Sequence, residues 1–152
     1  MPDIRKAGYG KGEIMDISYL ETLPEVENKP GFPLQEGERL VFLCRLEMLG
    51  TEKGKLISAA GWDCFLALSN RNLLVHNGAG VWTCDLAGDL VSCEKIERRT
   101  LFFKPAYHFL ARLKDEIVFD NGRQKLSGFE FYFEKKTDDM ERFEEIMGHL
   151  FP

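Results

Sequence analysis

The sequence predicts a mainly β domain with one α-helix at its C-terminal end. Short apolar segments alternate with period two through the middle of the chain, Gly- and Asn-rich turns separate them, and residues 137–152 change to helical spacing. The 152 residues, of which 44% are hydrophobic, fit one domain with a sizeable core. Short strands in series favour an antiparallel barrel or sandwich, and we expect seven strands.

Residues 1–35 are expected to form an N-terminal extension outside the main domain, which we place at 36–152. Apolar residues recur every three positions near its middle and predict a short helix over 13–23, at Ile14, Ile17, Leu20 and Leu23. The connector that follows is interrupted by Pro24, Pro30 and Pro33. Two interpretations of its apolar side chains stay open: they lie on the body as a strap, or they bind another chain.

The first predicted strand covers 39–48, with one face made of Leu40, Phe42, Cys44, Leu46 and Met48. The charged loop 50–55 follows, and further strands are expected near 62–69, 73–77, 81–86, 90–98, 106–113 and 129–136. Their predicted inward faces contain Trp62, Cys64, Leu66, Leu68, Trp82, Cys84, Leu86, Tyr107, Phe109, Ala111, Leu113, Phe129, Phe131 and Phe133. Glu130, Tyr132 and Glu134 are expected to point outward. Pro105 predicts a loop or bulge, residues 115–124 extend the sixth strand or add a short one, and Asn121-Gly122 is a strong hairpin signal.

The C-terminal segment has the spacing of an amphipathic helix. Thr137 and Asp138 are candidate N-caps, and Asp138 with Glu141 has capping-box spacing. One apolar stripe follows, made of Met140, Phe143, Ile146, Met147, Leu150 and Phe151. Acidic residues dominate its polar side, so packing on the core is favoured over binding at a membrane surface.

The order of elements resembles the pleckstrin-homology (PH) superfold, and the local pattern is similar to GRAM and bacterial PH-type domains. The similarity is carried by "FLALSNRNLLVH" at Phe65–His76 and by the ending "GFEFYFEKKTDDMERFEEIMGHL". It covers about residues 36–152. The resemblance implies a bent, antiparallel seven-stranded barrel capped by the C-terminal helix, and a binding role rather than catalysis.

Charge and composition restrict the partners. The net charge is −5, with −4 on residues 1–38, +3 on 39–136 and −4 on 137–152. General nucleic-acid binding needs a strongly basic surface, so we expect none. No apolar run of about 18 residues and no signal-peptide pattern is found, and the expected location is cytoplasmic.

Candidate catalytic chemistry is sparse. Four cysteines, Cys44, Cys64, Cys84 and Cys93, form no C-x-x-C pair and are expected to be buried thiols. The three histidines, at positions 76, 108 and 149, are scattered. No nucleophile, metal or nucleotide motif occurs in the required context. We therefore expect no enzyme, no metal and no cofactor.

Binding is the function that the resemblance implies. PH-type domains often hold phosphoinositide head groups through basic loops at the open end of the barrel, and the matching positions here are Lys53, Lys55, Arg123 and Lys125. The chain departs from that pattern, because Glu52 lies in the same loop and the next basic residue after Lys55 is Arg71. The leading hypothesis is protein interaction or self-assembly through a strand edge, the connector, or both. Anionic lipid head groups and a small-ligand barrel are the alternatives.

Overall fold

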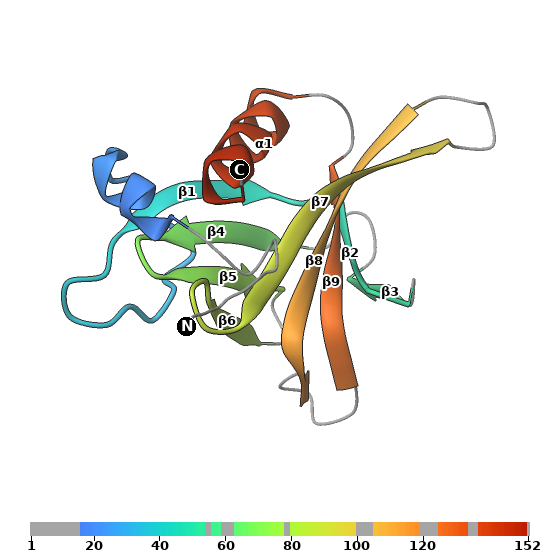
Figure 1. The fold of residues 1–152 in the computed structure, drawn as a ribbon, viewed down its shortest axis with the longest axis horizontal. Helices are drawn as coiled ribbons and strands as arrows, with labels where there is room; N and C mark the ends of the chain where they lie inside the picture. The colour runs from blue at the N-terminus through green and yellow to red at the C-terminus, as the bar shows by residue number, and fades with distance from the viewer. Residues whose placement is uncertain are drawn as a thin grey trace, which may run out of the picture.

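Two antiparallel sheets and one C-terminal helix make up the fold, which confirms the mainly β class (Figure 1). The computed structural model describes residues 16–53, 56–58, 63–77, 80–99, 105–118, 125–133 and 137–151. The four-stranded sheet has the order β1 (Leu40–Arg45), β4 (Phe65–Ser69), β5 (Asn72–His76), β6 (Val81–Asp85). The five-stranded sheet has the order β3 (Leu56–Ser58), β2 (Met48–Thr51), β9 (Lys125–Phe133), β8 (Pro105–Val118), β7 (Leu90–Arg99).

The first predicted strand is divided between the two sheets. β1 pairs with β4, and β2 pairs with β9. At the corner the N–H of Leu46 donates to the carbonyl of Cys64 (2.9 Å), and the N–H of Glu47 donates to the carbonyl of Tyr132 (2.9 Å). Adjacent residues thus bond to different sheets. Across the described residues the strands form two separate sheets, so the pairing does not show the single barrel that was predicted. The short strand β3 was not predicted.

A bulge in β1 changes which face Leu40 occupies. The register with β4 shifts between Leu40 and Phe42, and an extra residue in a strand reverses the alternation beyond it. Leu40 therefore joins a small cluster with Phe32, Ala67 and Leu74, whereas Phe42 belongs to the main core. The prediction that Leu40 and Phe42 share a face is wrong for this reason.

Met48 was also predicted to face inward, but beyond the corner Leu49 occupies the core instead. The predicted inward faces of the other strands are confirmed where they are described. The main core contains or contacts Cys64, Leu66, Leu68, Trp82, Cys84, Leu86, Tyr107, Phe109, Ala111, Leu113, Phe129, Phe131 and Phe133. Pro105 is the first residue of β8 rather than part of a loop, a position where the missing N–H is tolerated. β8 continues to Val118, so the extension is confirmed. Trp62, Glu134 and the Asn121-Gly122 turn lie outside the described residues.

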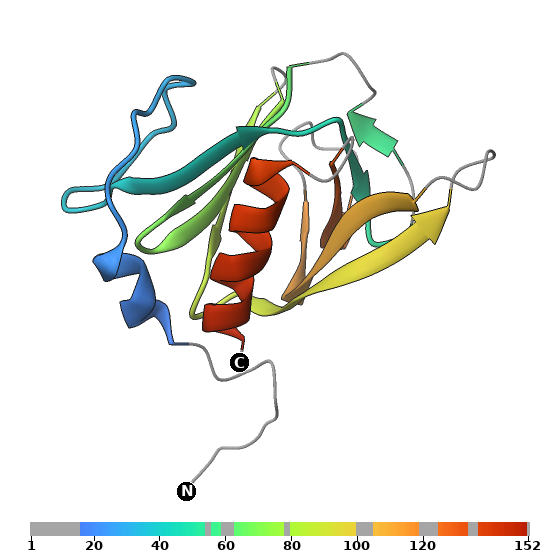
Figure 2. The same cartoon turned by 90° about the horizontal axis from the view of Figure 1, so that it is seen from above.

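Helix α1 (Asp138–Leu150) packs across the space between the two sheets (Figure 2). Thr137 is its N-cap, and the Thr137 hydroxyl accepts a bond from the N–H of Met140 (3.1 Å). Asp138 is therefore inside the helix, and the predicted Asp138–Glu141 capping box is wrong. The ring of Phe143 lies 5.6 Å from Phe42 of the four-stranded sheet and 5.0 Å from Phe109 of the five-stranded sheet, centroid to centroid. This one side chain joins all three elements.

The N-terminal segment packs on the body of the protein. The 3-10 helix η1 (Ile17–Thr22) confirms the predicted short helix over part of its range, and Leu20 is fully buried in the main core. Tyr19 stacks on His149 of α1 with ring centroids 3.9 Å apart. Residues 24–39 contain neither helix nor strand, and Phe32 is buried against the outer side of the four-stranded sheet. The strap interpretation is supported for these side chains.

Candidate interaction surface

The predicted basic end contains two described lysines, Lys53 and Lys125, and both are exposed. β2 ends where antiparallel β9 begins, and the N–H of Glu52 donates to the carbonyl of Gly128 (3.2 Å). The structure therefore brings Lys53 and Lys125 to the same end of the five-stranded sheet. Lys55 and Arg123 lie outside the described residues.

Acidic side chains lie at this end as well. The Glu52 carboxylate accepts a bond from the N–H of Ser127 (3.1 Å), and Glu52 directly precedes Lys53 in the chain. Asp115 and Glu116 are exposed on β8, one strand away, just before the pair formed by Ile117 and Leu126. Charges of both signs near one another weaken the field that a phosphate group would experience.

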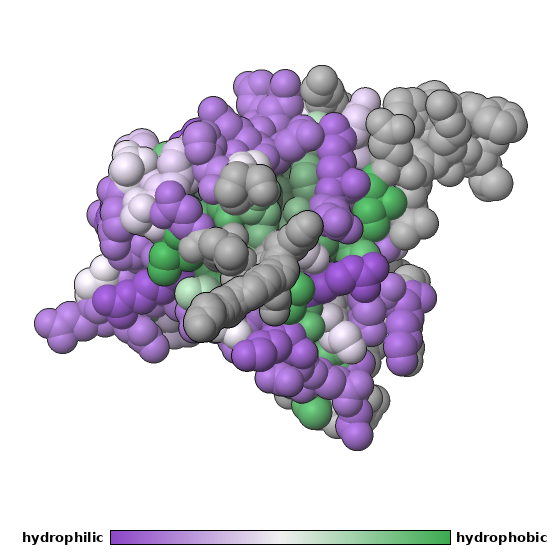
Figure 3. All heavy atoms as spheres, in the orientation of Figure 1, coloured by the Kyte–Doolittle hydropathy of each residue, from purple (hydrophilic) through white to green (hydrophobic). Residues whose placement is uncertain are grey.

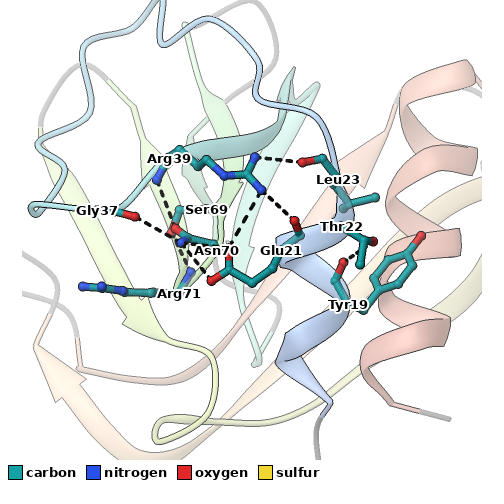
Figure 4. A network of polar contacts seen from close by, with 9 residues as sticks. All are labelled: Tyr19, Glu21, Thr22, Leu23, Gly37, Arg39, Ser69, Asn70 and Arg71. Carbon is teal, nitrogen blue, oxygen red and sulfur yellow. Dashed lines mark hydrogen bonds and ion pairs between the residues drawn. The ribbon is translucent and has the colours of Figure 1, made fainter.

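A polar clasp holds the strap, defined as residues 16–38, against the β4–β5 turn (Figure 4). The guanidinium of Arg39 donates to the carbonyl oxygens of Leu23 (2.8 Å) and Glu21 (3.0 Å). The side-chain oxygen of Asn70 accepts from the N–H of Arg39 (3.0 Å), and its amide donates to the carbonyl of Gly37 (3.2 Å). Each of these bonds joins residues far apart in the sequence.

Glu38 is the acceptor at the centre of the clasp. Its carboxylate accepts from the Ser69 hydroxyl (2.5 Å), the Asn72 amide (2.7 Å) and the N–H of Gln35 (3.0 Å). Burial on its own raises the pKa of Glu38, but these three donors and the charge of Arg71 more than offset it, so the pKa lies below its usual value. The ionised form of Glu38 therefore stabilises the docked strap.

The clasp accounts for the turn sequence "SNRN" within the segment that resembles PH-type domains. Ser69, Asn70 and Asn72 are buried, and Arg71 donates to the side chain of Gln35 (3.3 Å). These polar residues contact the strap of the same chain. The buried part of the connector therefore makes its contacts within the same chain.

The described strands leave four sheet edges, at β1 and β6 of the four-stranded sheet and at β3 and β7 of the five-stranded sheet. The turn at residues 86–89 connects β6 to β7, which belong to different sheets. β7 borders the five-stranded sheet on its lower side in Figure 2. β7 spans ten residues, whereas β1 spans six, β6 five and β3 three. A strand edge presents unpaired N–H and C=O groups that can pair with another chain. β7 therefore offers the longer template.

The exposed part of β7 is charged. Glu94 and Lys95 are exposed and Ile96 is partly buried, while Leu90 and Cys93 face the core. The ammonium of Lys95 lies 3.3 Å from the carboxylate of Glu144 on α1. Much of the outline of the face drawn in Figure 3 is hydrophilic, with hydrophobic residues among the hydrophilic ones near the centre.

A buried His–Glu pair on the outer side of the five-stranded sheet was missed by the sequence analysis. Nδ1 of His108 contacts a carboxylate oxygen of Glu130, and the two residues are 7% and 2% exposed. Tyr132 stacks on His108 with ring centroids 4.0 Å apart. Alternation correctly placed Glu130 on the side opposite the phenylalanines, but no local signal indicates that this position is buried.

All four cysteines are free and buried, as predicted, and burial with the nearby Asp89 raises the pKa of Cys84 to about 12. The described residues contain no group of three or more His, Cys, Asp or Glu side chains that could hold a metal ion. A pocket at the β6–β7 turn is lined by Ala87, Gly88, Leu90, Val91 and Lys114. One lysine and four small or apolar residues supply no acid–base pair.

No protein-family model, curated protein or solved structure matches this chain. Over the described ranges, no helix is both long and apolar enough to cross a membrane.

Proposed function

We propose that this chain is a non-enzymatic, PH-like binding module that recognises a protein partner by strand addition. The topology supports the PH-like part: β1 and β2 can be counted as one bent strand, and the short β3 as an addition to the loop that follows. Seven antiparallel strands and a C-terminal helix then remain, in the order expected of that superfold.

The single observation that carries the binding function is the free edge of β7. It is ten residues long, and no described strand lies beyond it. Main-chain hydrogen bonds to an added strand supply affinity, and the side chains of alternate residues supply specificity. The connector is the weaker candidate for binding a partner, because its buried side chains already pack against the body of the protein.

Site-specific photocross-linking in cells tests this function. A photoreactive amino acid replaces Glu94 on β7 in one variant and Glu145 on α1 in a matched control; both positions are exposed glutamates. We expect a covalent adduct with a protein from position 94 and none from position 145. Equal adducts from both positions, or none from position 94, would contradict recognition at the β7 edge.

Binding of anionic lipid head groups is the second candidate, favoured by the shared location of Lys53 and Lys125. Co-sedimentation with vesicles of mixed neutral and anionic lipids tests it, with Lys53→Glu compared with Lys29→Glu, an equally large change in charge at an exposed strap position. The head-group hypothesis expects loss of binding only for Lys53→Glu. Absence of wild-type binding at low salt, or equal loss in both variants, removes it.

A further inference from the structure

We propose that residues 24–38, the lid, move away from the body of the protein as one unit when the carboxylate of Glu38 takes up a proton. The lid is the part of the strap that follows helix η1 and Leu23. In the closed state it lies on the outer side of the four-stranded sheet, where Phe32 is buried. The clasp then acts as a pH-sensitive lock, independently of any binding at β7.

The two ends of the lid are held together by Arg39, the residue that directly follows it. The guanidinium of Arg39 donates to the carbonyl of Leu23, the residue just before the lid (2.8 Å; Figure 4). The N–H of Arg39 donates to the side-chain oxygen of Asn70 on the β4–β5 turn (3.0 Å). A compact surface loop of about 6–16 residues whose ends lie close together is an Ω-loop. The lid has this form, so it can move while the chain on either side stays in place.

Bonds within the lid hold it together as a unit. The side-chain amide of Asn28 donates to the carbonyl of Phe32 (2.9 Å), and the side-chain oxygen of Asn28 accepts from the N–H of Phe32 (2.9 Å). At the other end, the N–H of Glu38 donates to the carbonyl of Gln35 (3.0 Å), and Gly37 between them has a φ of 80°. Glycine adopts this backbone conformation without the steric cost that other residues incur. Opening of the lid breaks none of these bonds.

Few apolar contacts hold the lid on the body. Within the lid, every residue of which the structure describes, Phe32 is the one buried apolar side chain, and it belongs to the small cluster rather than to the main core. Leu20 of η1, in contrast, is fully buried in the main core. A segment with few buried apolar contacts opens locally at a lower free energy than the core. We therefore expect the lid to open while η1 and both sheets stay folded.

Glu38 fastens the C-terminal end of the lid to the body. Its carboxylate accepts bonds from the Ser69 hydroxyl and the Asn72 amide, both on the β4–β5 turn. Hydrogen bonds to an ionised acceptor are stronger than bonds to a neutral one. Protonation of Glu38 removes the charge and adds a hydrogen among groups that already act as donors. The neutral form therefore attaches the lid more weakly.

The charges near Glu38 set the direction of the switch. Burial raises the pKa of Glu38, but its hydrogen bonds and the charge of Arg71 more than offset this effect, so the pKa lies below its usual value. The other charged groups of the clasp are Arg39 and Glu21, which lie 3.9 Å apart, guanidinium nitrogen to carboxylate oxygen. The ionised form of Glu38 thus favours the closed lid. The lid opens as the pH falls below the usual value and through the pKa of the closed form.

Opening uncovers an edge of the four-stranded sheet. The carbonyl of Arg39 accepts from the N–H of Asn70 on the side of β4 (3.1 Å), and the carbonyl of Leu40 accepts from the N–H of Val26 in the lid (2.9 Å). Consecutive carbonyls of a strand point to opposite sides, so Val26 occupies a group on the free edge of β1. An uncovered strand edge can pair with another chain. The lock therefore controls access to an edge on a different sheet from β7.

Native-state hydrogen exchange in the full chain, followed by NMR at low urea concentrations, tests local opening. The N–H of Val26 bonds from the lid to the body, whereas the N–H of Leu46 bonds to Cys64 within the body. The protection factor of Val26 should be lower than that of Leu46 and should change little with urea, because local opening exposes little surface. The same urea dependence at both amides would show that the lid leaves only when the whole domain unfolds, which would overturn the proposal.

The role of Glu38 is tested by Glu38→Gln, with Glu36→Gln as the control at an exposed lid position. At pH ~6, Glu38→Gln should lower the protection factor of Val26 by about 10- to 100-fold, and Glu36→Gln should leave it unchanged. Between pH ~6 and pH ~3 the protection factor should fall in wild type and stay constant in Glu38→Gln. Equal protection in wild type and Glu38→Gln at pH ~6, or the same loss in acid in both proteins, would contradict a lock at Glu38.

Discussion

Two carboxylates, Glu38 and Glu130, are buried among the described residues, and each is held by different partners. Glu38 accepts bonds from the β4–β5 turn and from the strap, whereas Glu130 contacts His108 within one sheet. A buried carboxylate is costly unless its hydrogen bonds are satisfied. Each carboxylate therefore stabilises the fold only while its hydrogen-bond partners are present.

The docking of the strap should weaken in acid. Because the pKa of Glu38 is lower in the folded than in the unfolded chain, its contribution to stability is present above the unfolded value of about 4.5 and is lost as the pH falls through the folded value. Glu38→Gln should lower the free energy of unfolding by about 1–3 kcal/mol at pH ~7. The difference in the free energy of unfolding between wild type and Glu38→Gln should become smaller at pH ~3, as measured by urea denaturation.

The control for this prediction is Glu36→Gln, an exposed neighbour in the same segment. Its effect should be small, within about 0.5 kcal/mol at both pH values. A gap between wild type and Glu38→Gln that is the same at both pH values would contradict the role assigned to the ionised Glu38.

The His108–Glu130 pair should show strong coupling in a double-mutant cycle. Glu130→Leu leaves His108 buried without its carboxylate and should cost about 3 kcal/mol or more. The further change His108→Leu should recover part of this loss, because two apolar side chains leave no unpaired buried group at these positions. Guanidinium denaturation of the four proteins measures the coupling. Additive losses would show that the two residues stabilise the sheet independently.

At the scale of elements, α1 could be predicted because its apolar residues recur with a local period and Thr137 and Asp138 precede them. Strand β1 could be predicted only in part. Its alternation continues through Leu46 into β2, and the corner depends on bonding of Leu46 to Cys64 and of Glu47 to Tyr132. These partners are distant in the sequence, so no local sequence pattern indicates the bend. The bulge that moves Leu40 to the other face has the same origin in long-range pairing.

The packing of α1 should depend mostly on Phe143. This residue is fully buried and contacts aromatic rings of both sheets, so Phe143→Ala should lower the free energy of unfolding by about 3–5 kcal/mol, and Phe143→Asp should unfold the domain. The exposed Glu145→Ala loses only an ion pair with Arg142 and should cost about 0.5 kcal/mol. Thermal denaturation followed by circular dichroism compares them. A Phe143→Asp variant that melts like wild type would contradict the assignment of α1 to the core.

At the scale of the whole molecule, the class of fold follows from the sequence, but the arrangement of surfaces does not. Lys53 and Lys125 are at one end as expected, because β2 and β9 are antiparallel neighbours. The clasp could not be foreseen, since Glu38 and Ser69 are 31 positions apart and polar residues have no periodic signal. The edge position of β7 depends in the same way on the order of strands in the sheet.

Backbone amide hydrogen exchange in β7 is the most direct test of the central claim that this edge binds a protein strand. The chain is compared alone at low concentration and in complex with its partner, or at high concentration if the partner is a second copy. The account predicts slower exchange within 90–99 and little change in β6 and α1. Protection confined to α1 or to β6, with β7 unchanged, would contradict it.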